Sequence, residues 1–132
     1  MKLAIIGNLD KRGVPDAVGV LLERLERSSA SFVIDEQVAD LLDAAGRRVA
    51  GTHRRSLQQC VDEGEILVAF GGDGTILRAA EFAVVADVPL LGVNLGHVGF
   101  LAEVESDNVP DVAATIVQKS YVVEERLALS VK

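Results

Sequence analysis

Three glycines surround a single aspartate in the stretch Gly71-Gly72-Asp73-Gly74. Five apolar residues, 66–70, precede it and apolar residues at helical spacing follow it, so we expect a strand, a tight turn and a helix. In a parallel α/β sheet, ligands bind beyond the carboxyl ends of the strands, and the free N–H groups of a helix N-terminus attract phosphate. The sequence therefore predicts a phosphate-binding turn at residues 71–75.

Asp73 is unexpected among phosphate-binding amides, because its carboxylate repels the anion that the amides attract. Two roles would make the charge useful. Asp73 could accept the proton of a substrate hydroxyl that attacks the phosphate, or it could hold a metal ion bound to the phosphates. Both roles point to phosphoryl transfer to an alcohol. The structural alternative is a glycine-rich turn in which Asp73 caps the following helix.

A second glycine-rich loop, residues 94–101, follows the apolar run 90–93. This loop also lies at the carboxyl end of an expected strand, so we expect the two loops to face one crevice. His97 could be a general base or a phosphate ligand, but a histidine in such a loop is also a common turn residue. Phe100 could stack on a base or pack in the core.

A polar loop, residues 8–13, follows the first apolar run of the chain. Its place at the end of an expected strand makes Lys11 and Arg12 candidates for contacting a ligand phosphate. Exposed surface charge is an equally good interpretation of both residues.

The rest of the chain must supply the elements that position these loops. Short apolar runs predict buried strands at residues 3–6, 32–34, 66–70 and 90–93. Helical spacing predicts helices from Val14 to near Ser28, from Asp35 to Gly46, from Ser56 to Gly64, and after Thr75.

The last of these helices should turn Ile76, Leu77, Ala80 and Ala83 or Val84 inward. On the helix from Ser56 to Gly64, Cys60 is expected to be a small core residue, not a nucleophile. Apolar spacing predicts a further helix near residues 109–117, and residues 127–132 alternate as in a half-buried strand. We therefore expect an α/β domain at residues 1–122 and the start of a β-rich region at 123–132.

The composition is that of one globular domain, with 132 residues, 49% of them hydrophobic and 25% charged. The apolar runs are far shorter than the ~18 residues that a membrane span needs, and the first run is too short for a signal peptide. Because a single cysteine excludes an internal disulfide, we expect a reducing compartment, the cytoplasm.

A net charge of −7 argues against nucleic-acid binding. Positive charge gathers at Arg47-Arg48 and at His53-Arg54-Arg55, which we interpret as a solvated loop, with phosphate contact as the alternative. The sequence has no Gly-x-Gly-x-x-Gly after the first strand, no Walker Gly-Lys-Ser/Thr and no zinc-ligand pattern. The common nucleotide and zinc motifs are therefore absent.

At its two glycine-rich loops the sequence resembles the NAD kinases, which phosphorylate the adenosine-ribose 2′-hydroxyl of NAD to give NADP. The resemblance is carried by Gly71-Gly72-Asp73-Gly74-Thr75 with Leu77-Arg78, and by Gly92-Val93-Asn94 with residues 96–101. Phosphofructokinases and the diacylglycerol and sphingosine kinases share the first loop. The second loop, at this distance, is what makes the match specific to the NAD kinases.

The resemblance implies a Rossmann-like, phosphofructokinase-like three-layer α/β domain with a mostly parallel sheet, followed by a β-rich domain. It implies that Asp73 accepts the proton of the 2′-hydroxyl, that Gly72 and Gly74 let NAD approach the backbone, that Arg78 contacts the cofactor, and that Phe100 lines the adenosine side. Val98 stands where a leucine is common in the family.

NAD is the acceptor that the resemblance implies, ATP or polyphosphate is the donor, and a divalent metal such as Mg²⁺ is the cofactor, with metal ligands unknown. The family forms homo-oligomers, and its Asn-Glu pair and further NAD contacts lie in the β-rich domain. We therefore expect these 132 residues alone to leave the site incomplete. A lipid or sugar kinase with the same first loop and a non-catalytic nucleotide-binding module are the alternatives.

Overall fold

The protein is a parallel α/β domain, seen in a computed structural model that describes residues 2–10, 12–28, 30–95, 104–105 and 109–110. Its sheet has six strands in the order β3-β2-β1-β4-β5-β6, and every neighbouring pair is parallel. The strands are β1 Lys2–Gly7, β2 Ser31–Asp35, β3 Arg54–Arg55, β4 Ile66–Gly71, β5 Leu90–Asn94 and β6 Val104–Glu105. The four strands expected from apolar runs are confirmed.

The two edge strands were not expected from the sequence, because each has only two residues and neither is itself an apolar run. Arg54 and Arg55, which we interpreted as part of a solvated loop, form β3 and pair with Ile34 and Asp35 of β2. An edge strand has no neighbouring strand on one side and is open to water there, so polar residues are tolerated in it.

The helices are α1 Val14–Glu26, α2 Glu36–Ala44, α3 Leu57–Glu63 and α4 Asp73–Ala86, with a short 3₁₀ turn, η1, at Gly51–His53. Local chemistry starts α2 and α3 where it was expected. The Asp35 carboxylate accepts a hydrogen bond from the Gln37 amide at 3.4 Å. Ser56 and Gln59 form a reciprocal capping box at the start of α3.

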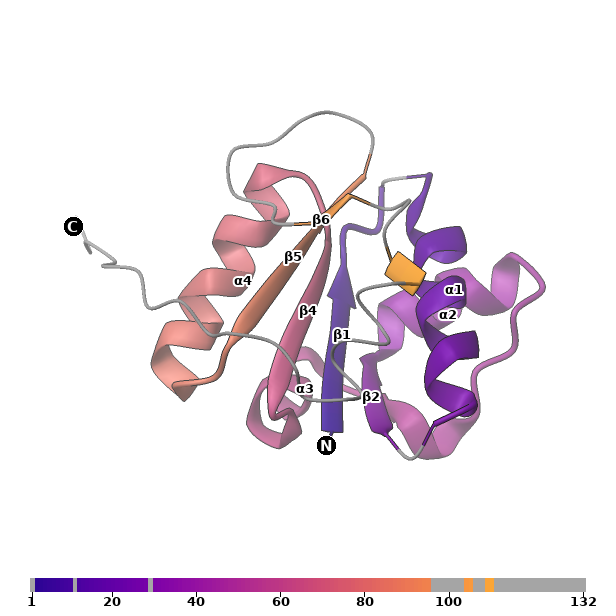
Figure 1. Ribbon diagram of the computed structural model, residues 1–132, viewed down its shortest axis with the longest axis horizontal. Coiled ribbons are helices and arrows are strands. Elements are labelled where there is room, and N and C mark those ends of the chain that lie inside the picture. Colours follow the sequence, from indigo (N-terminus) through magenta and orange to yellow (C-terminus); the bar gives the residue numbers. More distant parts are fainter. Residues whose placement is uncertain (1, 11, 29, 96–103, 106–108, 111–132) are drawn as a thin grey trace.

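Two helical layers cover the two faces of the sheet, as Figure 1 shows with α4 on one side of the central strands and α1 and α2 on the other. The side chains of β1 alternate between them: Leu3 and Ile5 join the core under α1 and α2, whereas Ala4 and Ile6 join the core under α3 and α4. The strands are therefore apolar on both faces, which confirms the three-layer fold.

The expected inner face of α4 is confirmed at Ile76 and Ala83 and was wrong at Leu77. Leu77 and Val84 are 57% and 62% exposed, and the buried positions are Ile76, Ala79 and Ala83. Helix α4 begins at Asp73, before Thr75, and it lies close to the sheet: a Cβ at Gly92 of β5 would be 2.9 Å from Cδ1 of Ile76. Gly92 has no side chain, which makes room for Ile76, and Ala79 and Ala83 are small enough to follow it against the sheet.

Val109 is buried in the core under α1 and α2. The rest of the helix predicted at 109–117, the strand predicted at 127–132 and the domain boundary between 122 and 123 lie outside the described residues. No helix in the described part of the chain is long and apolar enough to cross a membrane.

Candidate active site

The carboxyl ends of β1 and β4 mark the point where the sheet topology reverses. From β1 the chain continues to β2 on one side, whereas β4 lies on the other side of β1. In open α/β sheets the loops that leave such a pair of strands diverge, and ligands bind between them. Here the Asn8 amide, just past β1, donates to the Phe70 carbonyl of β4 at 2.9 Å. This hydrogen bond fixes the two loops relative to each other at their origin.

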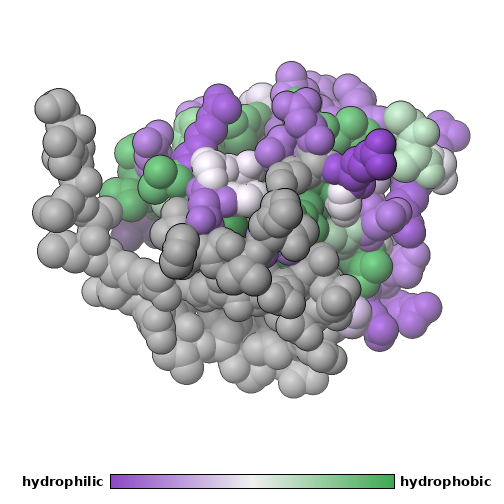
Figure 2. Space-filling view, turned by 90° about the horizontal axis from the view of Figure 1, so that it is seen from above, coloured by the Kyte–Doolittle hydropathy of each residue, from purple (hydrophilic) through white to green (hydrophobic). Residues whose placement is uncertain are grey.

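A cavity of about 450 Å³ opens at this edge of the sheet. Figure 2 looks down on the edge, where pale residues of intermediate hydropathy lie among purple hydrophilic ones. The cavity wall comes from the end of β1 and the loop after it, the junction of β2 and α2, the start of α3, and α4. Its residues are Ile6, Gly7, Asn8, Leu9, Asp10, Asp35, Gln37, Leu57, Gly74, Thr75, Arg78, Ala79 and Phe82.

The structural need for glycine differs among the three glycines of the 71–74 turn. A Cβ at Gly71 would lie 2.8 Å from the Cβ of Thr75, so the close packing of α4 on β4 requires glycine there. A Cβ at Gly72 or Gly74 would meet no heavy atom within 4 Å. Neither residue has a positive φ, and Gly72 has a φ of −103°. Nothing in the described part of the chain requires glycine at 72 or 74, and the space beside them is open to a ligand.

Asp73 is the first residue of α4 and is partly exposed. The N-cap position belongs to Gly72, so the interpretation of Asp73 as the capping residue was wrong. A carboxylate in the first turn is favoured by the helix dipole. Asp73 is not among the residues that line the cavity, but its neighbour Gly74 is. Asp73 thus adjoins the cavity wall in sequence without being part of it.

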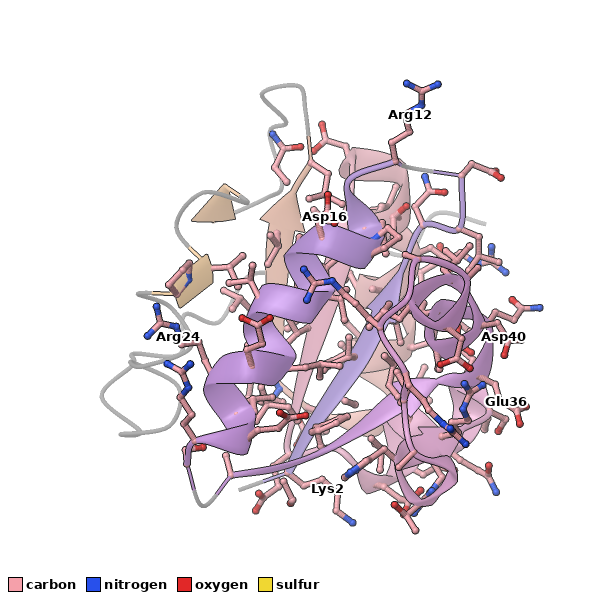
Figure 3. The ribbon with its side chains drawn as sticks, turned by 90° about the vertical axis from the view of Figure 1, so that its right-hand side faces the viewer. Lys2, Arg12, Asp16, Arg24, Glu36 and Asp40 are labelled. Atoms are coloured by element: carbon pink, nitrogen blue, oxygen red, sulfur yellow. The ribbon has the colours of Figure 1, made fainter. Side chains whose placement is uncertain are left out.

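Arg78 lines the cavity one turn after Gly74. It is the only basic residue among the described residues that line the cavity. Arg12 does not line the cavity; it is exposed, and Figure 3 shows it extending into solvent above the carboxyl edge. Lys11, His97 and Phe100 lie outside the described residues. Of the basic residues proposed from the sequence for this edge, the structure brings Arg78 to the cavity and leaves Arg12 outside it.

The two glycine-rich loops begin side by side. Gly71 of β4 is in register with Asn94 of β5, and the Leu95 amide donates to the Gly71 carbonyl at 3.1 Å. Asn94 is 7% exposed, and it is the only buried polar residue in the described part of the chain. The expectation that both loops leave one edge of the sheet is confirmed for their origins, and residues 96–101 of the second loop lie outside the described part.

Sequence reasoning missed two carboxylates of the cavity wall, Asp10 and Asp35. Asp35 was interpreted only as a helix cap, although its place directly after an expected strand was a signal for a site residue. Burial is the main cause of a raised pKa of the Asp35 carboxyl, and the charges of Glu36 and Asp40 add to it against the hydrogen bond from Gln37. The carboxylate is therefore partly withdrawn from water at the cavity wall.

Cys60 is fully buried in the core under α3 and α4. Burial, with smaller contributions from the charges of Asp35 and Glu63, raises the pKa of its thiol to about 12. A thiol with such a pKa is a poor nucleophile at neutral pH. The expectation of a core residue is confirmed.

The positive cluster after α2 is paired with carboxylates. Arg54 binds Asp40 at 2.7 Å and also Asp43. Arg55 binds Glu63 at 2.8 Å. Because these guanidinium groups have partners within the fold, the structural interpretation of the cluster is preferred to phosphate contact.

No group of three or more His, Cys, Asp or Glu that could hold a metal occurs among the described residues. This set of donors still fits Mg²⁺ that arrives on a substrate, because Mg²⁺ usually takes one or two carboxylates and completes its shell with phosphates and water. Asp73 and Asp10 supply carboxylates at this edge.

The fold and the cavity define a Rossmann-like α/β domain with a ligand crevice at its topological switch point. Comparison with known proteins identifies the family: the model of the ATP-NAD kinase N-terminal domain matches residues 3–121. The chain belongs to this family, which confirms the resemblance seen in the sequence.

Individual relatives agree with the family match. The chain is 49% identical to the NAD kinase of Cutibacterium acnes over 113 residues, which are 86% of this chain and 34% of that protein. It is 31% identical to the NAD kinase of Flavobacterium psychrophilum over 134 residues, covering 100% of this chain and 45% of that protein. It is 53% identical to NAD kinase 2 of Streptomyces avermitilis over 78 residues, 59% of this chain and 26% of that protein. The chain thus spans less than half the length of each of these relatives.

Proposed function

We propose that the full-length protein is an NAD kinase, which transfers a phosphoryl group from ATP or polyphosphate to the adenosine-ribose 2′-hydroxyl of NAD. One observation carries the proposal within this family: open space beside Gly72 and Gly74, at the start of a helix whose first residue is Asp73. The turn combines an accessible backbone that can bind phosphate with a carboxylate that can take a proton.

In the proposed reaction, the 2′-hydroxyl oxygen of NAD attacks the terminal phosphorus of the donor. A new O–P bond forms, the bond from that phosphorus to its bridging oxygen breaks, and with ATP the leaving group is ADP. Asp73 accepts the hydroxyl proton as the new bond forms. The amide groups at the N-terminus of α4 and the guanidinium of Arg78 hold the phosphates.

Gly72 and Gly74 let NAD come close to the backbone, and Phe100 lines its adenosine side in this proposal. Mg²⁺ would supply neutralising charge to the phosphates, and Asp10 of the cavity wall is the carboxylate that would hold it, while Asp73 accepts the proton. The cavity wall carries two carboxylates and one guanidinium, so the phosphates need this additional positive charge.

Residues 1–122 form the α/β domain of the proposed enzyme, and the chain from 123 onward starts a β-rich domain that completes the NAD site. We place the enzyme in the cytoplasm as a homo-oligomer with small-molecule substrates and without a nucleic-acid or membrane partner. The lipid- or sugar-kinase alternative is not favoured, since the relatives are named NAD kinases.

The proposal is tested by identifying the molecule that accepts the phosphoryl group. The full-length protein is incubated with labelled ATP and Mg²⁺ together with NAD, diacylglycerol and fructose 6-phosphate, and the products are separated. We expect label in NADP alone. Label in either other acceptor, or binding of NAD by calorimetry without turnover, would overturn the assignment in favour of a different kinase or a non-catalytic module.

A further inference from the structure

Asp35 occupies a distinctive position in the cavity wall. It ends β2, the neighbour of β1 on the side away from β4, and its carboxylate lines the cavity. Its Oδ1 accepts the Gln37 amide, and the residue is only half-buried, so the carboxylate is accessible from the cavity. Burial, which raises the pKa of this carboxyl, shows that the group is partly withdrawn from water.

An acidic residue at this topological position has a well-understood use in the Rossmann fold. There a carboxylate at the end of the strand beside the first strand accepts hydrogen bonds from the ribose hydroxyls of a bound nucleotide. The chain of this protein has the same placement without the usual glycine fingerprint after β1. Asp35 therefore offers a ribose-binding acceptor that the glycine motifs do not reveal.

The dimensions of the edge fit a nucleotide. Only β1 separates β2 from β4, and neighbouring strands lie ~4.8 Å apart, so Asp35 and the turn after β4 are roughly 10 Å apart. A ribose and its phosphate chain can bridge this span, with phosphates at Gly74 and Arg78. The side chains of Leu57 and Phe82 form an apolar part of the wall, which suits the face of a base.

The position of Asp73 indicates which nucleotide occupies the cavity. In an in-line transfer the attacking hydroxyl and the leaving group lie on opposite sides of the transferred phosphoryl group. Asp73, the proposed proton acceptor, stands outside the cavity wall, whereas Gly74, Thr75 and Arg78 are part of it. The acceptor hydroxyl then belongs on the Asp73 side of the turn, and the donor belongs in the cavity.

We propose that this cavity binds the nucleoside part of a nucleoside triphosphate donor and that Asp35 accepts hydrogen bonds from its ribose hydroxyls. The inference rests on the proposed kinase function and extends it by naming the donor class and a donor-binding residue. It also predicts that a donor without ribose hydroxyls has a higher KM.

The test compares ATP with 2′,3′-dideoxy-ATP as donors for the full-length protein at saturating NAD. We expect the wild-type KM for the dideoxy donor to be about tenfold higher or more, because hydrogen bonds to a charged acceptor are the stronger kind. In Asp35→Ser, whose hydroxyl still caps α2, the two donors should differ by about twofold at most, and the KM for NAD should not change.

The matched control is Glu36→Ser, which removes the adjacent carboxylate. Glu36 is exposed and does not line the cavity, so this variant should discriminate between the donors as wild type does. Equal KM values for both donors in the wild type would overturn the inference without requiring any variant to fold. Full discrimination in Asp35→Ser, or a rise in the KM for NAD alone, would also overturn it. Failure of the kinase proposal itself looks different, since no donor would then yield NADP.

Discussion

Gly71 at the end of β4 lies directly opposite Asn94 at the end of β5, and the Leu95 amide donates to the Gly71 carbonyl at 3.1 Å. Because of this pairing, two loops that are separate in the sequence leave the sheet at adjacent points. The same end of β4 is closely covered by α4, since a Cβ at Gly71 would be 2.8 Å from the Cβ of Thr75. The start of α4, with Asp73, is thereby held at the edge where both loops begin.

Gly71 and Gly74 should respond in opposite ways to the same substitution. Gly71→Ala places a methyl group against Thr75 and should lower the free energy of unfolding by ~1–3 kcal/mol, because α4 must shift away from β4. Gly74→Ala meets no neighbour within 4 Å and should leave stability unchanged or raise it by up to ~1 kcal/mol. Urea unfolding measures both effects.

If a ligand approaches the backbone at Gly74, Gly74→Ala should nevertheless weaken substrate use. The expected signature is a raised KM for NAD or ATP in a protein that is at least as stable as wild type. A Gly74→Ala protein with wild-type kinetics would show that the open space there is not used by a substrate.

Asp73→Asn tests the proposed proton acceptor. The amide keeps the size of the side chain but cannot take a proton, so kcat for NADP formation should fall by ~10²–10⁴-fold in the full-length protein. Stability should fall by at most ~1 kcal/mol, the usual value of a charge near a helix N-terminus. Turnover is followed by NADP formation and stability by thermal unfolding. Near-normal turnover would remove Asp73 from the chemistry.

Asp35→Asn should stabilise the protein in a pH-dependent way. The pKa of the Asp35 carboxyl is raised above its ordinary value of 3.8, chiefly by burial, so the folded protein holds this proton more tightly than the unfolded chain does. The fold therefore loses stability as pH rises from 3.8 to the folded-state pKa, and the deficit persists at higher pH. Asparagine carries no charge and caps a helix as well as aspartate.

The melting temperature of Asp35→Asn should exceed that of wild type at pH 7, and the difference should vanish below pH 3.8, where both side chains are uncharged. Glu81→Gln, at an exposed position of α4 whose charge is not among those that raise the Asp35 pKa, is the control and should show no such gain. A lower melting temperature for Asp35→Asn at pH 7 would mean that burial is not the dominant influence on this carboxylate.

The Cys60 thiol should not react with thiol reagents in the folded protein. With a thiol pKa of about 12, roughly one thiol in ten thousand is ionised at pH 8, and the side chain is fully buried. We expect no reaction with a disulfide reagent such as DTNB until denaturant unfolds the chain, when one thiol per chain should react. Rapid reaction of the native protein, compared with a Cys60→Ala blank, would contradict the assignment of Cys60 to the core.

Local chemistry made most of this fold predictable. Continuous apolar runs are sufficient to predict strands that are buried on both faces, as in β1 and β4. Asp35 and Ser56 start their helices because side-chain oxygens satisfy free amides within a few residues. The glycine-aspartate turn was likewise readable, because a strand, a turn and a helix follow one another without a gap.

The predictions from sequence were wrong where a residue's position depends on contacts with a distant part of the chain. Spacing predicted Ile76, Leu77, Ala80 and Ala83 or Val84 on the inner face of α4. Packing against Gly92 of β5 buries Ile76, Ala79 and Ala83 there and leaves Leu77 exposed. Helical periodicity limits which residues share a face; the shape of the opposing surface selects the face that is buried. Arg54 was assigned to a solvated loop because its partners, Asp40 and Asp43, belong to a separate helix.

By itself, then, the sequence determined the four strands with apolar runs, the helices that start with a local cap and the turn that carries Asp73, because each depends on neighbours along the chain. The cavity was decided by tertiary structure alone. Its wall combines Asp10, Asp35 and Arg78 from three separate segments, and only the order of the parallel strands brings these side chains to one edge. Strand order depends on long-range packing of both sheet faces, so no local pattern could place Asp35 beside the glycine turn.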